Sequence, residues 1–297
     1  APVGSVTKAA SIAYGLPSPC QVSAGTTDSI AAFIAAECEE DGDAVTSLGS
    51  TLAIKMISKT PVEDARYGKA RQLLSIPAHK KPSWCFLDCA GVYSHKLGSK
   101  WLVGGASNTG GAVLTNLGLT VEKLQELSAL IDPTTPSELD YYPLIKPGDI
   151  LIVDVARSSR HWPRALCKTG ERFPVCDPDL EPRLTPKPDS EVEFLHGVLE
   201  SMSRIEKEAF DVLSELGASD VNRVFTAGGG NRDYHYCMRK LNKCHWFSRE
   251  YFTGSANDTW IAIRERVLGV QVKPSTETEA AYGTALLAMK GSQKLIP

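Results

Sequence analysis

The sequence predicts an α/β fold, and three observations indicate this class. Paired, alternating apolar stretches predict two β-hairpins, in residues 44–57 and 83–106. A long stretch with apolar residues at helical spacing covers residues 190–216. Glycine-rich turns stand at the ends of predicted strands, where the backbone can approach a phosphate or a base closely.

The composition narrows the possible partners. The chain has 297 residues, of which 42% are hydrophobic and 23% charged, enough for one large or two moderate cores. The formal net charge is -3, and no run of Lys and Arg alternates with aromatic residues, which favours small molecules over nucleic acid. No apolar stretch approaches the roughly 20 residues of a membrane helix, and eight scattered Cys favour a reducing compartment. We expect a soluble, globular protein with no membrane partner.

The first predicted elements are a strand and a helix. Residues 20–24, CQVSA, are typical of the end of a strand. The following segment, GTTDSIAAFIAAECEE, predicts a helix with Ile30, Phe33 and Ile34 on one face. Asp28 stands at the start of this helix, where the ordinary role of an Asp is that of an N-cap.

The two hairpins have different continuations. In residues 44–57 the small, polar turn is Leu48-Gly49-Ser50. The hairpin in residues 83–106 runs directly into SNTGGAVLTNLG, which predicts a helix opened by Ser107 or Asn108.

The second half of the chain alternates helices with one strand. The helix in residues 190–216 has Asp189 or Ser190 as its cap and Gly217 as its stop. A strand and a glycine turn, VNRVFTAGGG, follow. Later come GSANDTWIAIRERVLG, a helix capped by Asn257 or Asp258, and TEAAYGTALLAMKG, a last helix.

Three glycine-rich elements are candidate ligand contacts: SLGST in a hairpin turn, GGASNTGG before a helix and GGG after a strand. Taken singly, each is what a tight turn requires. Taken together, they provide three places where backbone N–H groups could face an anionic ligand.

This combination of motifs resembles the C-terminal half of the FGGY carbohydrate kinases, which have the actin-like, ribonuclease-H-like ATPase fold. The resemblance rests on AGTTDSIAAF, TSLGSTLAI, GGASNTGGAVL, GERFPVCDP, the GGG turn and TEAAYGTALLA, in family order from about residue 14 to residue 290. It is closest to the plant and cyanobacterial D-ribulose kinases, also called xylulose-kinase-like. The resemblance implies ATP-dependent phosphorylation of the terminal hydroxyl of a ketopentose, D-ribulose before D-xylulose, with Mg²⁺. It also implies a chloroplast or cytoplasmic location.

The resemblance also implies roles for individual residues. Asp28 matches the catalytic base, which takes the proton of the attacking sugar hydroxyl. Arg172 matches a position between the lobes, where we expect a structural ion pair. The expected nucleotide contacts are Gly49 and Ser50 for the phosphates, Gly110 and Gly111 at a helix entrance, and Gly229, Gly230 and Asn257 at the adenine pocket.

The family pattern predicts two lobes and two interruptions. Residues 1–36 match the end of the N-terminal lobe, with the catalytic Asp and a hinge helix, and residues 37–297 match the C-terminal nucleotide-binding lobe. We expect most of the N-terminal lobe to be absent from this chain. Removing residues 149–170 and 231–254 would restore unbroken family motifs. Both segments follow a Gly and end in Thr-Gly, which suggests retained introns, with real loops as the alternative.

Other interpretations stay open beside the kinase. A truncated nucleotide-binding module without turnover would carry the same turns, whereas a dehydrogenase is disfavoured because no turn has the G-x-G-x-x-G spacing. The group His235, Cys237, Cys244 and His245 could bind zinc, although its spacing differs from that of common zinc modules. Packing roles are expected for Cys85, Cys89 and His95, and His196 is expected to be a hydrogen-bonded interface histidine.

Overall fold

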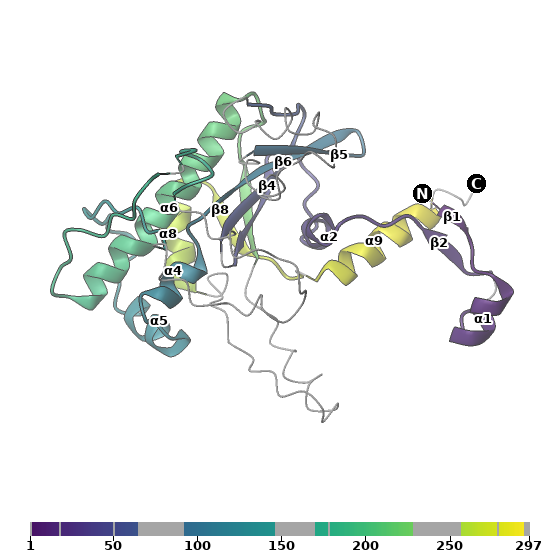
Figure 1. The fold of residues 1–297 in the computed structure, drawn as a ribbon, viewed down its shortest axis with the longest axis horizontal. Coiled ribbons are helices and arrows are strands. Elements are labelled where there is room, and N and C mark those ends of the chain that lie inside the picture. The colour runs from purple at the N-terminus through teal and green to yellow at the C-terminus, as the bar shows by residue number, and fades with distance from the viewer. Residues whose placement is uncertain are drawn as a thin grey trace, which may run out of the picture. The chain divides into compact units, whose positions relative to one another are not determined.

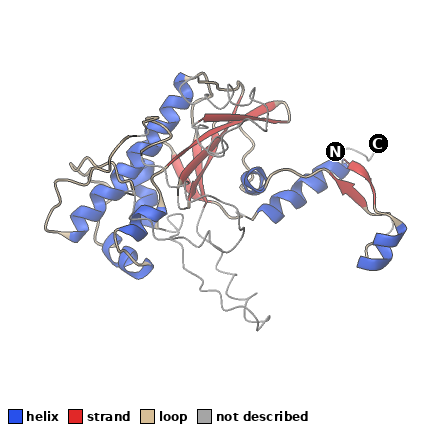
Figure 2. Cartoon of the chain, in the orientation of Figure 1, coloured by secondary structure: helices blue, strands red, loops and turns tan. Residues whose placement is uncertain are grey.

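The structure, a computed structural model, describes residues 2–17, 19–49, 51–64, 92–145, 170–177, 179–227, 257–277 and 279–293. Two compact units divide the chain. The smaller combines residues 1–39 with residues 275–297, and the larger comprises residues 40–274. Figures 1 and 2 show the elements of both. The lobe boundary expected after residue 36 stays a prediction.

The smaller unit contains a two-stranded sheet and three helices. Strand β1 is antiparallel to β2, and both ends of the chain contribute helices. The elements are β1 (Pro2–Ser5), α1 (Lys8–Tyr14), β2 (Gln21–Ser23), α2 (Asp28–Ala35) and α9 (Ala280–Gln293). The predicted strand at residues 20–24 and the two predicted helices are therefore present, whereas β1 and α1 were not expected.

Helix α2 is packed against α9 at very short range. A Cβ added to Gly283 would lie 1.8 Å from the carbonyl oxygen of Ala31, so only glycine permits this approach. The buried residues of α2 include Ala31, Phe33 and Ala35, while Ile30 and Ile34 are only partly buried. The predicted helix is present, but of its three apolar residues Ile30, Phe33 and Ile34 only Phe33 is fully buried, because close contact with another helix selects small side chains.

The larger unit is built on one mixed six-stranded sheet, in the order β5-β6-β4-β3-β7-β8. Neighbours from β5 to β3 are antiparallel, and β3, β7 and β8 are parallel. The strands are β3 (Asp43–Leu48), β4 (Leu52–Ser58), β5 (Val92–Leu97), β6 (Lys100–Ser107), β7 (Arg223–Ala227) and β8 (Gln271–Pro274). Both predicted hairpins are confirmed as β3–β4 and, within its described part, β5–β6.

Helix α6 packs against strands β4 and β6 of this sheet, and α5 and α8 pack against α6. Helices α6 and α8 run beside each other (Figure 1). The helices are α4 (Gly111–Asn116), α5 (Val121–Ser128), α6 (Glu191–Glu215) and α8 (Asp258–Leu268). The hydroxyl of Ser190 accepts from Glu193 N and caps α6, and Asn257 caps α8, as predicted. The core includes Leu48, Ile54, Met56, Val198, Met202, Leu213, Val224 and Ile263.

One polar cluster lies inside this core. Glu206 of α6 and Arg264 of α8 are fully buried and form two hydrogen bonds, of 2.6 and 2.7 Å. Thr46 of β3 donates to Glu206 as well. Because breaking a buried pair leaves an uncompensated charge, the cluster fixes the register of both helices against the sheet.

The structure corrects two helix starts. Strand β6 continues to Ser107, so α4 begins only at Gly111 with Gly110 as N-cap, not at the predicted Ser107 or Asn108. Helix α2 has Thr27 as N-cap, and Asp28 is its first helical residue. Both predicted caps were chosen by residue type alone. Ser107 proves to be a strand residue and Asp28 a helical residue, and the caps are Gly110 and Thr27.

Several predictions fall outside the described residues. These are the GGG turn, residues 231–254 with the four possible zinc ligands, residues 149–169, Cys85 and Cys89. Within the described ranges no group of His, Cys, Asp or Glu could hold a metal ion. In the same ranges no helix has the length and apolar character needed to cross a membrane.

Candidate functional site

The candidate site lies where several strands of the sheet end. Strands β3, β6 and β7 point the same way, because β3 is parallel to β7 and β4 is antiparallel to both β3 and β6. Their last residues lie at one edge, with Leu52 opposite Ser107 and Ser47 opposite Ala227. The carboxyl edge of the strands is where open α/β sheets bind their ligands.

Two of the predicted glycine turns meet at this edge. The N–H of Gly111 donates to the carbonyl oxygen of Gly49 at 2.7 Å, and Leu52 N donates to Thr109 O at 2.6 Å. The turn after β3 and the turn after β6 therefore form one hydrogen-bonded unit. Gly110 has φ 156° and ψ -167°, a conformation that is essentially restricted to glycine. In the described part of the chain the Gly110 N–H makes no hydrogen bond.

Asn257 lies at the start of α8, toward the same edge. Helix α8 ends just before β8, where Glu265 accepts a hydrogen bond from Val272 N, so its first turn points to the carboxyl ends of the strands. The Asn257 side chain accepts from Trp260 N at 2.8 Å and donates to Ser128 Oγ at 2.9 Å. Both polar groups of this buried side chain are therefore engaged within the protein.

The remaining predicted residues are placed only in part. Asp28 opens α2 and belongs to the smaller unit, whereas Gly49, Gly110, Gly111 and Asn257 belong to the larger one. Ser50, Gly229 and Gly230 lie outside the described residues. The described strand β7 ends at Ala227, beside the end of β3.

A buried carboxylate that the sequence did not single out holds the turn after β6. Glu171 is 2% exposed, and both of its oxygens accept hydrogen bonds. Oε1 accepts from the backbone N–H groups of Asn108 (2.7 Å), Arg172 (2.8 Å) and Phe173 (3.4 Å). Oε2 accepts from the hydroxyls of Ser107 (2.5 Å) and Tyr142 (3.1 Å). Its place within GERFP was the one sequence signal that could have identified it.

The side chain of Asn108 also links the turn after β6 to the segment that contains Glu171. Its amide nitrogen donates to Gly170 O at 2.7 Å, and its oxygen accepts from Arg172 Nε at 2.6 Å. Arg172 thus binds an amide, and in the described part of the chain it has no carboxylate partner. The expected ion pair of Arg172 is therefore absent among these residues, because the neighbouring carboxylate of Glu171 already accepts from five donors, one of them the backbone N–H of Arg172.

Burial dominates the electrostatics of Glu171. Desolvation raises the pKa of its carboxyl above the ordinary value, and the hydrogen bonds from Ser107, Asn108, Arg172 and Phe173 oppose this rise. The carboxyl is thus held by a dense set of donors in a site that water does not reach.

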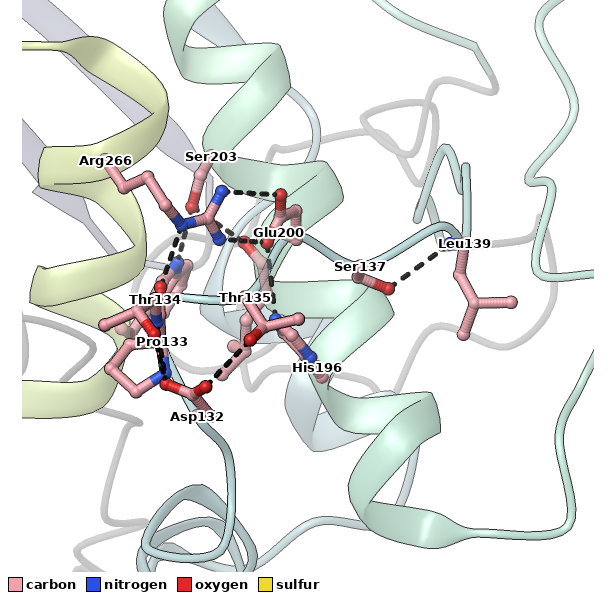
Figure 3. A network of polar contacts seen from close by, with 12 residues as sticks. Asp132, Pro133, Thr134, Thr135, Ser137, Leu139, His196, Glu200, Ser203 and Arg266 are labelled. Carbon is pink, nitrogen blue, oxygen red and sulfur yellow. Dashed lines mark hydrogen bonds and ion pairs between the residues drawn. The ribbon is translucent and has the colours of Figure 1, made fainter.

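A second polar network joins α6 and α8 to the loop that contains Pro133 (Figure 3). The Arg266 guanidinium faces the Glu200 carboxylate, and its Nε donates to Pro133 O at 2.8 Å. His196 Nε2 lies 3.3 Å from Glu200 Oε2 but makes no well-aligned hydrogen bond, contrary to the expected hydrogen-bonded histidine. Burial acts against the charge of Glu200, yet Arg266 holds the pKa of this carboxyl below its ordinary value.

The mixed sheet, its helices and the joined turns define the class of the fold: the α/β fold of actin-like ATPases in the form found in sugar kinases. The chain superposes on a xylulose kinase from Brucella ovis with a TM-score of 0.66 and 14% identity, covering 99% of this chain and 48% of that one. A gluconate kinase from Lactobacillus acidophilus matches with a TM-score of 0.64 and 13% identity, covering 99% and 47%. Glycerol kinase from Plasmodium falciparum with ADP matches with a TM-score of 0.56 and 14% identity, covering 99% and 46%.

These likenesses concern the fold. No protein-family model matches the chain. The chain spans about half the length of the solved structures that it matches.

Proposed function

We propose that this chain is the catalytic-base and nucleotide-binding part of an ATP-dependent carbohydrate kinase. The observation that carries the proposal is the pair of glycine turns at Gly49 and Gly110–Gly111, joined by hydrogen bonds at the carboxyl edge of the sheet. A fold shared with xylulose, gluconate and glycerol kinases supports the same reaction class.

ATP fits the chemistry of these turns. Gly110 has a glycine-only conformation, and its N–H has no partner among the described residues, which suits close approach of a phosphate oxygen. In this assignment ATP with Mg²⁺ supplies the γ-phosphoryl group and neutralises part of its charge. Gly49 and Ser50 hold the phosphates with Gly110 and Gly111, and Gly229, Gly230 and Asn257 form the adenine pocket, where Asn257 shapes the start of α8.

Asp28 is the proposed general base. An Asp in the first turn of a helix stays ionised near neutral pH, because the helix N-terminus favours negative charge. Phosphoryl transfer passes through a loose transition state and asks more for positioning than for a strong base. Asp28 would take the proton of the sugar hydroxyl as this oxygen attacks the γ-phosphorus.

The finer proposal concerns the sugar. We place the substrate among the ketopentoses, D-ribulose before D-xylulose, with transfer to the terminal hydroxyl and a chloroplast or cytoplasmic location. The support is the likeness of the motifs around Asp28, Gly49 and Gly110 to those of the D-ribulose kinases.

A coupled assay of ADP release by the full-length parent protein tests both levels. D-Ribulose should give the highest kcat/KM, D-xylulose a lower one, and gluconate and glycerol little or none. Activity with gluconate or glycerol alone would support the carbohydrate-kinase function and overturn the proposed ketopentose substrate. Lack of sugar-dependent ADP release with every sugar would overturn the kinase.

Asp28→Asn in the same parent protein tests the base. Turnover should fall by about two to four powers of ten, the usual contribution of a general base, while ATP binding stays nearly intact. Turnover at the wild-type rate would show that Asp28 only opens a helix.

The alternative is a nucleotide-binding module without turnover. It is favoured by one observation: Asp28 and the glycine turns belong to different compact units of the chain. Such a module would bind ATP in a calorimetric titration and release no ADP when a sugar is added to the parent protein.

A further inference from the structure

We propose that Glu171 is a positioning residue for the nucleotide-phosphate turn at residues 109–111. This inference rests on the proposed function for the identity of the ligand. It assigns to Glu171 no contact with the nucleotide, only control of the backbone that makes the contact.

The first argument is how Glu171 differs from other buried carboxylates. Asp43, Glu200 and Glu206 are each buried to a similar degree, and each pairs with an arginine: Arg223, Arg266 and Arg264. In the described part of the chain Glu171 has no Lys, Arg or His partner. Its charge is met only by backbone N–H groups and hydroxyls.

The second argument is which backbone these donors belong to. Ser107 and Asn108 are the two residues directly before the turn, and both are bound to Glu171. Ser107 Oγ also accepts from Thr109 N at 3.0 Å. The Glu171 carboxylate therefore holds Ser107 and Asn108 directly and Thr109 through Ser107, and these three residues lead into Gly110.

The third argument is that the turn is held from two sides. Toward the sheet, Thr109 and Gly111 are bonded to Leu52 and Gly49. On the other side, Arg172 and Phe173 donate to the same Glu171 oxygen as Asn108. Because a phosphate turn must offer its N–H groups in fixed directions before the ligand arrives, Glu171 supplies preorganisation.

The test compares Glu171→Gln with Asp43→Asn. Gln has the shape of Glu, and its carbonyl oxygen can still accept the three backbone N–H groups, so the fold should form. Asp43 is a buried carboxylate at the opposite end of β3 from Gly49, which makes it a matched control. Both variants are titrated calorimetrically with a nonhydrolysable ATP analogue and Mg²⁺, and their amide hydrogen exchange is measured.

Glu171→Gln should weaken nucleotide binding by about tenfold or more, the effect of losing one charge-assisted hydrogen bond. Exchange at Gly111, whose N–H donates to Gly49 O, should accelerate. Asp43→Asn should bind within about twofold of wild type, because its site is remote from the turn, even where it lowers the free energy of unfolding more. In the parent kinase, Glu171→Gln should raise the KM for ATP and leave the KM for the sugar unchanged.

Equal affinities of Glu171→Gln and wild type would overturn the positioning role, as would equal losses in both variants. Failure of the wild-type chain to bind nucleotide would overturn the proposed function instead. The exchange rate at Gly111 would then still decide whether Glu171 holds the turn. Ser107→Ala, which removes a single donor, should show the same exchange effect at smaller size.

Discussion

At the scale of single residues, the end of β6 and the turn after it each contain a buried hydroxyl, and the two hydroxyls have opposite environments. Ser107 donates to Glu171 and accepts from Thr109 N. The hydroxyl of Thr109 is buried and has no hydrogen-bond partner in the described part of the chain. A buried polar group without a partner costs free energy, whereas a bonded one contributes a modest net stabilisation.

Thr109→Val and Ser107→Ala should therefore have different effects on stability. Val replaces an unpaired hydroxyl by a methyl group of similar size, so the free energy of unfolding should stay within about 0.5 kcal/mol of wild type or rise. Ser107→Ala leaves Glu171 short of one donor and should cost about 1 to 3 kcal/mol. Urea unfolding of both variants measures this, and a larger loss in Thr109→Val would reveal a partner of its hydroxyl.

Glu171 should also make stability depend on pH. Because burial raises its pKa in the folded protein, the folded state binds more protons than the unfolded state at pH values above the ordinary Glu pKa of about 4.3. The stabilisation is then fully present below that value and is lost as pH rises through the higher folded pKa. Wild type should accordingly lose stability relative to Glu171→Gln in this window, measured by urea unfolding at several pH values. A constant difference would contradict the raised pKa.

At the scale of elements, periodicity predicted long elements well and short ones poorly. The 25-residue α6 and both hairpins follow from apolar spacing and caps, since each presents a full buried face. Strand β8 has four residues of which only Val272 is buried, and α1 buries none, so neither carries a readable pattern. The cap of α4 was predicted at the wrong residue because the Ser107 hydroxyl donates to Glu171, which is distant in sequence, and no local pattern encodes this hydrogen bond.

The α2–α9 contact gives a test at this scale. Gly283→Ala should destabilise the smaller unit by about 1 to 3 kcal/mol, because the added Cβ would overlap the Ala31 carbonyl. Gly291→Ala is the matched control on the same helix, since its added Cβ would meet only Ser23 Oγ at 3.5 Å and Ala favours helix. Thermal unfolding followed by circular dichroism should show a lower Tm for Gly283→Ala alone. Similar Tm values for both variants would argue against tight packing.

At the scale of the whole molecule, the sequence predicted the α/β class of the fold and the glycine turns at the ends of strands, but it did not predict the contacts that hold these turns together. Gly49 and Gly111 were both chosen as ligand contacts, and the structure joins them directly. Their common edge follows from strand direction, which hairpin and crossover rules make accessible from sequence. Glu171 was missed because three of its five donors, on Ser107, Asn108 and Tyr142, lie 64, 63 and 29 positions away in the sequence.

The segment at residues 231–254 gives a prediction for the whole chain. Its removal should tighten binding of a nonhydrolysable ATP analogue by about tenfold and raise solubility, because it separates Gly230 from Asn257 and contains six aromatic residues. Loop closure itself costs little more with length. Calorimetric titration of both forms decides this, with removal of residues 149–170 as the comparison. Equal affinities would identify a tolerated surface loop.

The packing of α2 on α9 also sets an order of events during synthesis. Tyr282 of α9 and Glu37, just after α2, form a hydrogen bond across 245 positions of sequence. A ribosome adds about 5 to 20 residues per second, so α2 waits roughly 10 to 50 s for its partner helix. During that time the face containing Ala31 and Phe33 has no α9 to cover it, and a nascent chain halted before residue 280 should recruit chaperones that bind apolar helices.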